Sequence, residues 1–173
     1  MTAICIAAMF LFAVCYQMIR SGVFLSLAIT FGTISYHLAM RLLVGFGTLI
    51  FMKGNFNYNG KWFSPKPFEP GLYRKLRVKH WKDKMPTYNP ENFSMKEHSP
   101  EEIIRTMCIS EIGHELNIAL SFVPLSFALI WGEFPVFLIT SIAGGLIDLP
   151  FVIMQRYNRP RLVRMVEKRK EIC

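Results

Sequence analysis

The stretch that decides the fold is PVFLITSIAGGLIDLPFVIMQ, residues 135–155. It contains a single charged residue, Asp148, and is followed at once by a basic tail that begins at Arg156. An α-helix rises about 1.5 Å per residue, so about 20 apolar residues cross the roughly 30 Å hydrocarbon core of a bilayer. The stretch therefore predicts a membrane-spanning helix.

Charged and apolar residues are segregated along the rest of the chain as well. The chain has 173 residues, of which 52% are hydrophobic, and yet its formal net charge is +8. Residues 2–52 and 116–155 each contain only two charged residues, whereas residues 53–105 and 156–173 hold eighteen of the twenty Lys and Arg. This pattern predicts an all-α membrane protein, a small helical bundle in which residues 1–173 form a single integral membrane domain.

The apolar runs predict about four transmembrane helices, at residues 2–19, 23–47, 111–131 and 135–155. A cytoplasmic, interfacial insert of about residues 53–100 and a basic C-terminal tail, 156–173, complete the chain. The second run extends to residue 52, about 45 Å as one helix, so it either tilts or turns near Gly45 and Gly47. A three-span protein, with this run partly re-entrant, is the alternative.

The sequence predicts where one helix begins, ahead of the third span. Ser99, Pro100 and Glu102 supply an N-cap serine, a proline at the first helical position and the glutamate of a capping box. The helix is expected to begin outside the bilayer and to kink at Pro124.

The distribution of Lys and Arg also predicts the orientation. Lys and Arg are concentrated in cytoplasmic loops, so both basic segments are expected inside. The predicted protein is a multi-pass protein of a bacterial cell membrane, with both termini in the cytoplasm and the turn at Glu133 outside. Trp62, Tyr73 and Trp81 are interleaved with basic residues of the insert, which favours docking to lipid headgroups over binding of nucleic acid.

Ionisable residues inside spans are costly and therefore mark candidate functional sites. His37 and Arg41 lie four residues apart on one helix face, and Glu111 and His114 lie three apart on another. Asp148 lies about two turns from the cytoplasmic end of the last span. In the predicted topology these residues share one depth, near the cytoplasmic leaflet, where a small bundle would bring them into one cavity.

Histidine with a carboxylate partner can take a proton from a hydroxyl, so we expect His114 and Glu111 to be catalytic. Arginines can bind phosphate, carboxylate or a developing oxyanion. The expected substrate-binding residues are His37, Arg41, Asp148, Arg156, Asn158, Arg159 and Arg161. Each has a plainer interpretation as a helix-packing, interfacial or charge-neutralising residue, and only their convergence favours a site.

Several chemistries lack their motifs in this sequence. The segment from His114 reads H-E-L-N-I, and Ile118 stands where a zinc protease would have its second histidine. No G-x-S-x-G, Walker or dinucleotide-binding loop is present, so we expect no metal and no cofactor.

Four segments resemble a known family. They are LPFVIMQRYNRPRL from Leu149 to Leu162, the E-I-G-H segment from Glu111 to His114, W-K-D-K from Trp81 to Lys84, and the passage from Asn55 to Phe63. Together they are similar to the glycosyl-4,4'-diaponeurosporenoate acyltransferases of carotenoid biosynthesis. The similarity extends from about Asn55 to Leu162, and His37 and Arg41 have no counterpart in it.

The resemblance implies a membrane acyltransferase that esterifies a sugar hydroxyl of a glycosylated carotenoid, or a similar glycolipid, with a fatty acyl group. Its partners would be membrane lipid, a lipid-linked sugar substrate and an acyl donor such as acyl-CoA, used as co-substrate. Two other classes stay open: a small membrane reductase or methyltransferase acting on a lipid, and a non-catalytic accessory subunit. The acyl chain length, the acceptor and the oligomeric state are left open by the sequence.

Overall fold

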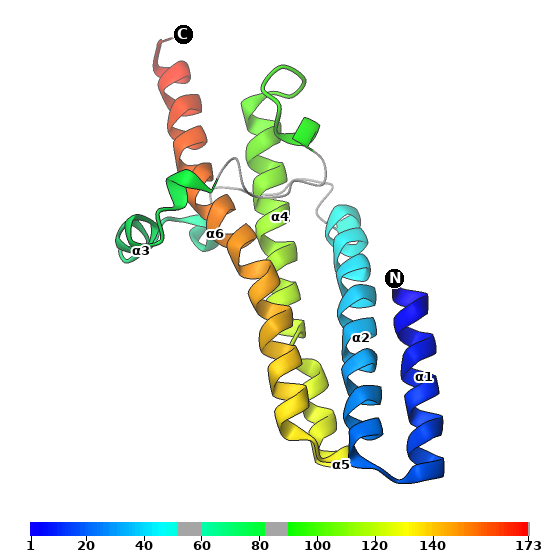
Figure 1. The fold of residues 1–173 in the computed structure, drawn as a ribbon. Helices are drawn as coiled ribbons and strands as arrows, with labels where there is room; N and C mark the ends of the chain where they lie inside the picture. The colour runs from blue at the N-terminus through cyan, green and yellow to red at the C-terminus, as the bar shows by residue number, and fades with distance from the viewer. Residues whose placement is uncertain (52–59, 82–89, 173) are drawn as a thin grey trace. The chain divides into compact units, whose positions relative to one another are not determined.

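The protein is helical throughout the part that its computed structural model describes, residues 1–51, 60–81 and 90–172 (Figure 1). No strand occurs in these ranges. The long helices are α1 (Thr2–Ile19), α2 (Gly22–Phe51), α4 (Pro100–Leu120) and α6 (Phe134–Ile172). The predicted all-α fold is confirmed.

Four segments are long and apolar enough to cross a membrane: Thr2–Ile19, Gly22–Phe51, Pro100–Trp131 and Phe134–Glu171. The first coincides with the predicted span. The second continues as one helix through Gly45 and Gly47, so the run does not turn there. Four candidate spans result, in agreement with the four-helix prediction rather than the three-span alternative.

The predicted start of α4 is confirmed in detail. The Ser99 hydroxyl accepts a hydrogen bond from the Glu102 backbone N–H at 3.3 Å, and the Glu102 carboxylate accepts one from the Ser99 N–H at 2.8 Å. This reciprocal capping box satisfies backbone donors that the first helical turn leaves unpaired. The helix does not kink at Pro124 as predicted but ends before it: α4 stops at Leu120, and a short 3-10 helix, η4 (Val123–Phe127), and then α5 (Ala128–Trp131) follow.

The chain forms two compact units. The apolar unit comprises Met1–Gly47 and Glu115–Leu149, and the basic unit comprises Thr48–His114 and Pro150–Cys173. Each unit is described by itself below.

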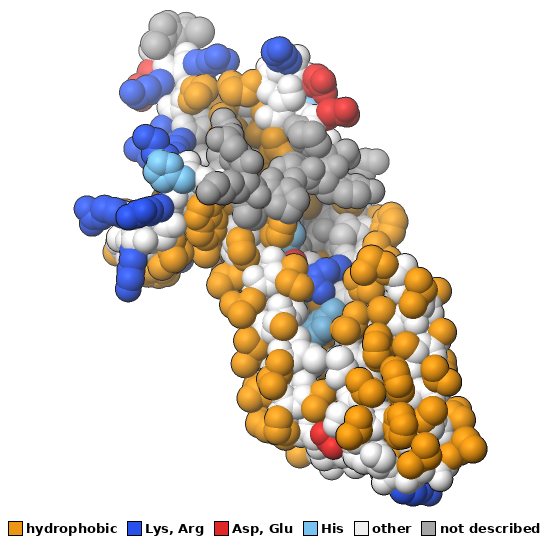
Figure 2. Space-filling model, in the orientation of Figure 1, with side chains coloured by type: hydrophobic (Ala, Val, Ile, Leu, Met, Phe, Trp, Pro, Cys, Tyr) orange, Lys and Arg blue, Asp and Glu red, His pale blue; other side chains and the backbone are white. Residues whose placement is uncertain are grey.

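The apolar unit turns its hydrophobic side chains outward. None of the residues of α1 is buried, and Leu129 is 92% exposed. The face in Figure 2 shows hydrophobic side chains over most of this unit. A surface of this kind suits lipid rather than water.

Two tight turns lie at one end of the apolar unit (Figure 1). Arg20 has the left-handed conformation, with φ 56°, and its N–H donates to the Tyr16 carbonyl at 2.8 Å, which ends α1. Gly132 and Glu133, with φ 70° and 52°, connect α5 to α6. The Ser26 hydroxyl of α2 donates to the Glu133 carboxylate at 3.0 Å, so the turn is tied to α2.

The basic unit has a small apolar core and a strongly charged surface. Phe63, Ile104, Cys108 and Val166 form the core, against which Leu162 also packs. Phe63 belongs to η1 (Lys61–Phe63), and the short helices α3 (Glu69–Lys75) and η2 (Val78–His80) follow it. Basic side chains gather over α3 and the C-terminal part of α6 in Figure 2.

Candidate active site

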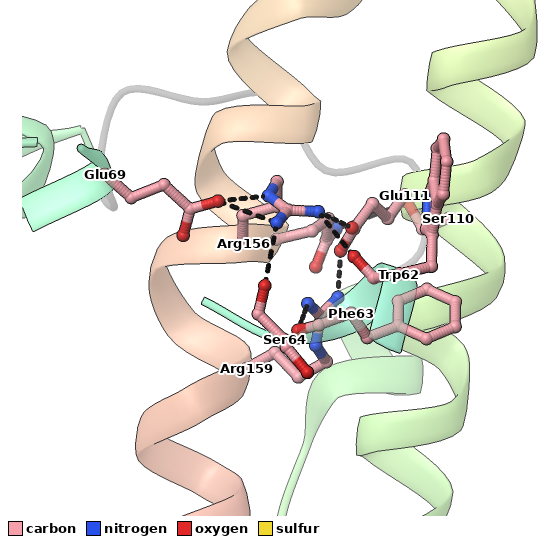
Figure 3. Close-up of polar contacts among 9 residues, drawn as sticks. Trp62, Phe63, Ser64, Glu69, Ser110, Glu111, Arg156 and Arg159 are labelled. Carbon is pink, nitrogen blue, oxygen red and sulfur yellow. Dashed lines mark hydrogen bonds and ion pairs between the residues drawn. The ribbon is translucent and has the colours of Figure 1, made fainter. Parts of the chain in front are cut away.

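The centre of the candidate site in the basic unit is the Glu111 carboxylate, which is completely buried (Figure 3). One of its oxygens accepts a hydrogen bond from Arg156 Nη1 at 2.7 Å. The other accepts a hydrogen bond from Arg159 Nη1. A carboxylate removed from water is tolerated only when its charge is paired and hydrogen-bonded, and the two arginines of α6 provide both.

The two guanidinium groups are themselves held by η1 and α3 (Figure 3). Arg156 donates to the Glu69 carboxylate, with both N···O distances 2.7 Å, and to the Ser64 carbonyl at 3.3 Å. Arg159 donates to the Phe63 carbonyl at 2.5 Å, and its guanidinium lies 4.8 Å from the centre of the Phe63 ring. Two arginines therefore face two carboxylates, so the charges of this cluster balance. We call these four charged residues, Glu69, Glu111, Arg156 and Arg159, the arginine–carboxylate cluster.

Sequence spacing explains how the cluster forms. Arg156 and Arg159 lie three residues apart on α6 and so share one helix face. Glu69 opens α3, where a carboxylate is favoured by the positive end of the helix dipole, and Pro70 occupies the first turn. The cluster thus joins α3, α4 and α6 of the basic unit.

His114 lies one turn after Glu111 on α4. Its ring stacks on Phe151 of α6, with the ring centres 4.7 Å apart and the planes inclined by 11°. The side chain is half-buried, which leaves part of the imidazole accessible. The stacking fixes the orientation of the ring, as a proton-transferring group requires.

Tyr157 and Arg161 lie beside the cluster. The Arg161 guanidinium lies 3.8 Å from the centre of the Tyr157 ring, and Tyr73 meets that ring edge-on at 5.3 Å. Burial, followed by the neighbouring Glu69 carboxylate, raises the pKa of the Tyr73 phenol. Tyr73 is therefore a neutral phenol at physiological pH.

The apolar unit holds a second buried group of charges. Arg41 donates to Asp148 through Nη2 at 2.7 Å and through Nε at 3.0 Å, and to the Gly144 carbonyl at 2.7 Å. Asn117 donates to the other Asp148 oxygen at 3.1 Å. Arg41 also donates to the His37 carbonyl at 3.1 Å. We call this group the Arg41–Asp148 cluster.

The His37 ring of this cluster packs directly on Gly144. A Cβ atom at position 144 would lie 2.7 Å from His37 Cε1, so only glycine lets α2 and α6 approach this closely here. His37 is 6% exposed, and neither ring nitrogen makes a well-formed hydrogen bond to a described residue.

The structure thus brings the predicted site residues together in two groups. Glu111, Arg156 and Arg159 meet in the basic unit, and His37, Arg41 and Asp148 meet in the apolar unit. Asn158 makes no side-chain hydrogen bond within the part of the chain that the structure describes. The predicted cavity shared by all these residues stays a prediction, as do their catalytic and binding roles.

Sequence reasoning missed Glu69, Phe63 and Asn117. Glu69 carried a signal, because it is the only acidic residue among six Lys and Arg in residues 60–81. Phe63 contributes a carbonyl as well as a ring, and a backbone acceptor has no signature in sequence. Of the segments that carried the family resemblance, residues 55–59 and 82–84 lie outside the described residues.

The four candidate spans indicate a multi-pass membrane protein. The sequence model of the CrtO family, glycosyl-4,4'-diaponeurosporenoate acyltransferase, matches residues 59–168. The chain therefore belongs to this family of acyltransferases of carotenoid biosynthesis, and the resemblance seen in the sequence is confirmed. Comparison with curated proteins and with solved structures finds no match.

The matched range contains Glu111, His114 and all of the tail residues up to Lys168. His37 and Arg41 precede it. The arginine–carboxylate cluster therefore lies wholly within the family region, whereas the Arg41–Asp148 cluster lies only partly within it.

Proposed function

We propose that the protein transfers a fatty acyl group to a sugar hydroxyl of a glycosylated carotenoid or a similar glycolipid, with His114 as the general base. The observation that carries this proposal is the position of His114. It lies within the family region, stacked on Phe151 and half-buried, one helical turn from a buried carboxylate.

In the proposed reaction the sugar oxygen attacks the carbonyl carbon of the activated acyl donor while His114 Nε2 or Nδ1 takes the hydroxyl proton. A C–O ester bond forms and the bond from the carbonyl carbon to the leaving group breaks. The leaving group then accepts the proton from His114, which returns the imidazole to its neutral form. The sequence offers no nucleophilic serine or cysteine in an activating motif, so direct attack is preferred to a covalent acyl-enzyme.

Glu111 has two proposed roles. It would orient His114, which lies one turn away on the same face of α4. It also fixes Arg156 and Arg159 against α4. Because those two arginines are already bound to carboxylates, Arg161 is the better placed of the three predicted arginines to meet an anionic substrate.

The substrates support a membrane location for the reaction. A fatty acyl chain and a glycosylated polyene both partition into the bilayer with their reactive ends at the headgroups. We propose that the reaction takes place at the cytoplasmic leaflet, with both termini, Lys66 and Lys168 inside and Glu133 outside. Single cysteines at positions 66, 133 and 168, in a background without the native cysteines, test this orientation: a membrane-impermeant thiol reagent applied to intact cells should label position 133 only. Labelling of position 168 from outside would contradict this orientation.

The proposed activity is tested by mass spectrometry of products formed by the purified protein in nanodiscs, with acyl-CoA and a glycosyl carotenoid. His114→Ala should lower turnover by about 10²-fold or more, the usual scale of general acid–base catalysis. His98→Ala, in the same unit and 3.8 Å from the exposed Glu102, is the matched control and should keep full turnover.

A simple glucolipid offered in place of the carotenoid tests the acceptor. If product forms with the glucolipid but not with the carotenoid, the result would support acyl transfer and refute the glycosylated carotenoid as the acceptor. Near-normal turnover of His114→Ala would reject His114 as the base. A bound nicotinamide or methyl donor without any acylated product would favour the alternative enzyme classes.

A further inference from the structure

A cavity of about 500 Å³ lies in the basic unit, between the α3–η2 segment and α6. Its volume falls in the range of small-molecule binding sites, which is roughly 300–1,000 Å³. The basic side chains that line it, apart from Arg156 of the cluster, are Arg74, Arg77, Lys79, His80, Arg161 and Arg164. We call this cavity the basic pocket.

The charge of the basic pocket is not neutralised by the residues that the structure describes. Glu69 is the one acidic residue among the described residues of its lining, and that carboxylate is bound to Arg156 at 2.7 Å. In the described residues none of the other five Lys and Arg of the pocket forms an ion pair. With six Lys and Arg against one Glu, the lining has a formal charge of +5. Like charges held this close together repel, so an anionic ligand would stabilise them.

Two features hold these side chains in place. The Arg161 guanidinium is stacked on Tyr157, which Tyr73 supports edge-on, so its position is restricted. Arg77 has φ 53°, a left-handed conformation that costs a non-glycine residue free energy. That conformation reverses the chain between α3 and η2, and the Arg77 carbonyl accepts from the His80 N–H at 2.9 Å.

We propose that the basic pocket binds a ligand with two or more phosphate groups. Guanidinium groups form charge-assisted, often bidentate hydrogen bonds to phosphate oxygens, and several of them around one cavity match a multiply charged anion rather than a single carboxylate. The inference rests on the proposed function in one respect, because an activated acyl donor such as acyl-CoA would bring such a group. Two carriers have this chemistry: the phosphorylated nucleotide of coenzyme A, and the headgroup of a phospholipid with two phosphates, such as cardiolipin.

This proposal differs from the sequence-based expectation because two of the predicted phosphate-binding arginines belong to the arginine–carboxylate cluster. The sequence assigned Arg156, Arg159 and Arg161 alike to substrate binding, but the first two are committed to Glu69 and Glu111. The free cationic groups are Arg161 and the residues that α3 and η2 bring to it. Phosphate binding is therefore assigned to these residues of the basic pocket rather than to Arg156 and Arg159.

The test measures binding, not turnover. Wild-type protein in phosphatidylcholine nanodiscs is titrated with coenzyme A and with pantetheine, which lacks the nucleotide and all phosphates. Coenzyme A should bind, more weakly at higher salt, and pantetheine should not. The double variant Arg77→Gln/Arg161→Gln should weaken binding at least tenfold. Arg105→Gln/Arg169→Gln, which removes two exposed charges of the same unit outside the pocket, is the matched control and should bind like wild type.

The second arm measures cardiolipin that remains with the protein after purification from cardiolipin-containing membranes. If the wild-type protein does not bind coenzyme A, and the pocket variant but not the control loses this lipid, the result would support the proposal with a lipid as the carrier. Equal effects in both variants, or no effect on either ligand, would overturn it. Circular dichroism checks that both variants are folded. Binding of coenzyme A without acyl transfer would refute the proposed function alone, whereas acyl transfer that the pocket variant leaves unchanged would refute the pocket alone.

Discussion

The two buried charge clusters differ in how completely their polar atoms are hydrogen-bonded. In the arginine–carboxylate cluster both oxygens of Glu111 accept from arginines, and both arginines also donate to backbone carbonyls of η1 or the residue after it. In the apolar unit, Arg41 and Asp148 are well paired. Around them, however, the two His37 nitrogens and Asn117 Oδ1 are buried without a well-formed hydrogen bond in the described part of the chain.

This difference has an energetic meaning. An unmatched polar atom costs free energy in surroundings of low dielectric constant, whereas a fully satisfied network rigidifies the elements that it joins. We therefore expect the arginine–carboxylate cluster to hold α3, α4 and α6 of the basic unit firmly. The Arg41–Asp148 cluster should tolerate substitution better. Four variants test this comparison.

The largest effect is expected for Glu111→Gln. An amide leaves Arg156 and Arg159 without a full negative charge at a site that is completely buried. Breaking a buried ion pair in this way typically costs about 3–5 kcal/mol of folding stability. Denaturant titration in detergent, followed by circular dichroism, measures the loss. Glu167→Gln, an exposed acid of the same unit, is the control and should change stability by less than about 0.5 kcal/mol.

Asp148→Asn should cost less, about 1.5–3 kcal/mol, the usual value for a hydrogen bond to a charged group. Arg41 would keep the Gly144 and His37 carbonyls as acceptors, and its side chain is 21% exposed, so its charge is less isolated. The same titration measures the loss. A loss as large as that of Glu111→Gln would remove the contrast between the two clusters.

Gly144→Ala tests the close packing of His37. The added Cβ would lie 2.7 Å from His37 Cε1, so the ring must move, and overpacking of this kind costs about 1–3 kcal/mol. In a His37→Ala background the same change should be nearly neutral. A double-mutant cycle gives the coupling. Equal losses in both backgrounds would show that the His37 ring is not the group that requires glycine.

The smallest effect is expected for Asn117→Ala, about 0.5–1 kcal/mol. It removes one hydrogen bond to Asp148 at 3.1 Å, which is worth roughly 0.5–1.5 kcal/mol. Removal of the buried, unmatched Oδ1 offsets part of that loss. Thermal unfolding of the purified protein is sensitive enough to measure it. A loss above about 2 kcal/mol would mean that Asn117 is essential to the cluster.

The apolar runs of the sequence predicted the four long helices, both ends of α1 and the start of α4, whereas α4 ends earlier and α6 ends later than the predicted spans. Runs of apolar residues of the right length allow few structures in a membrane, because every backbone group must be hydrogen-bonded within its own segment. For this reason α1 was predicted to the residue, and the start of α4 could be read from Ser99, Pro100 and Glu102. The Leu149–Leu162 segment, with three shorter ones, indicated the family, and the family model matches residues 59–168.

The contacts between the charged residues, in contrast, followed from the way the helices pack. Helical spacing places Glu111 and His114 on one face of α4, but it does not say what the Glu111 carboxylate contacts. Its partners are Arg156 and Arg159 of α6, and Glu69, at the start of α3, in turn binds Arg156. Partners that are 40 to 90 residues away along the chain, and acceptors that are backbone carbonyls, are set by packing between elements, and no local pattern encodes that packing.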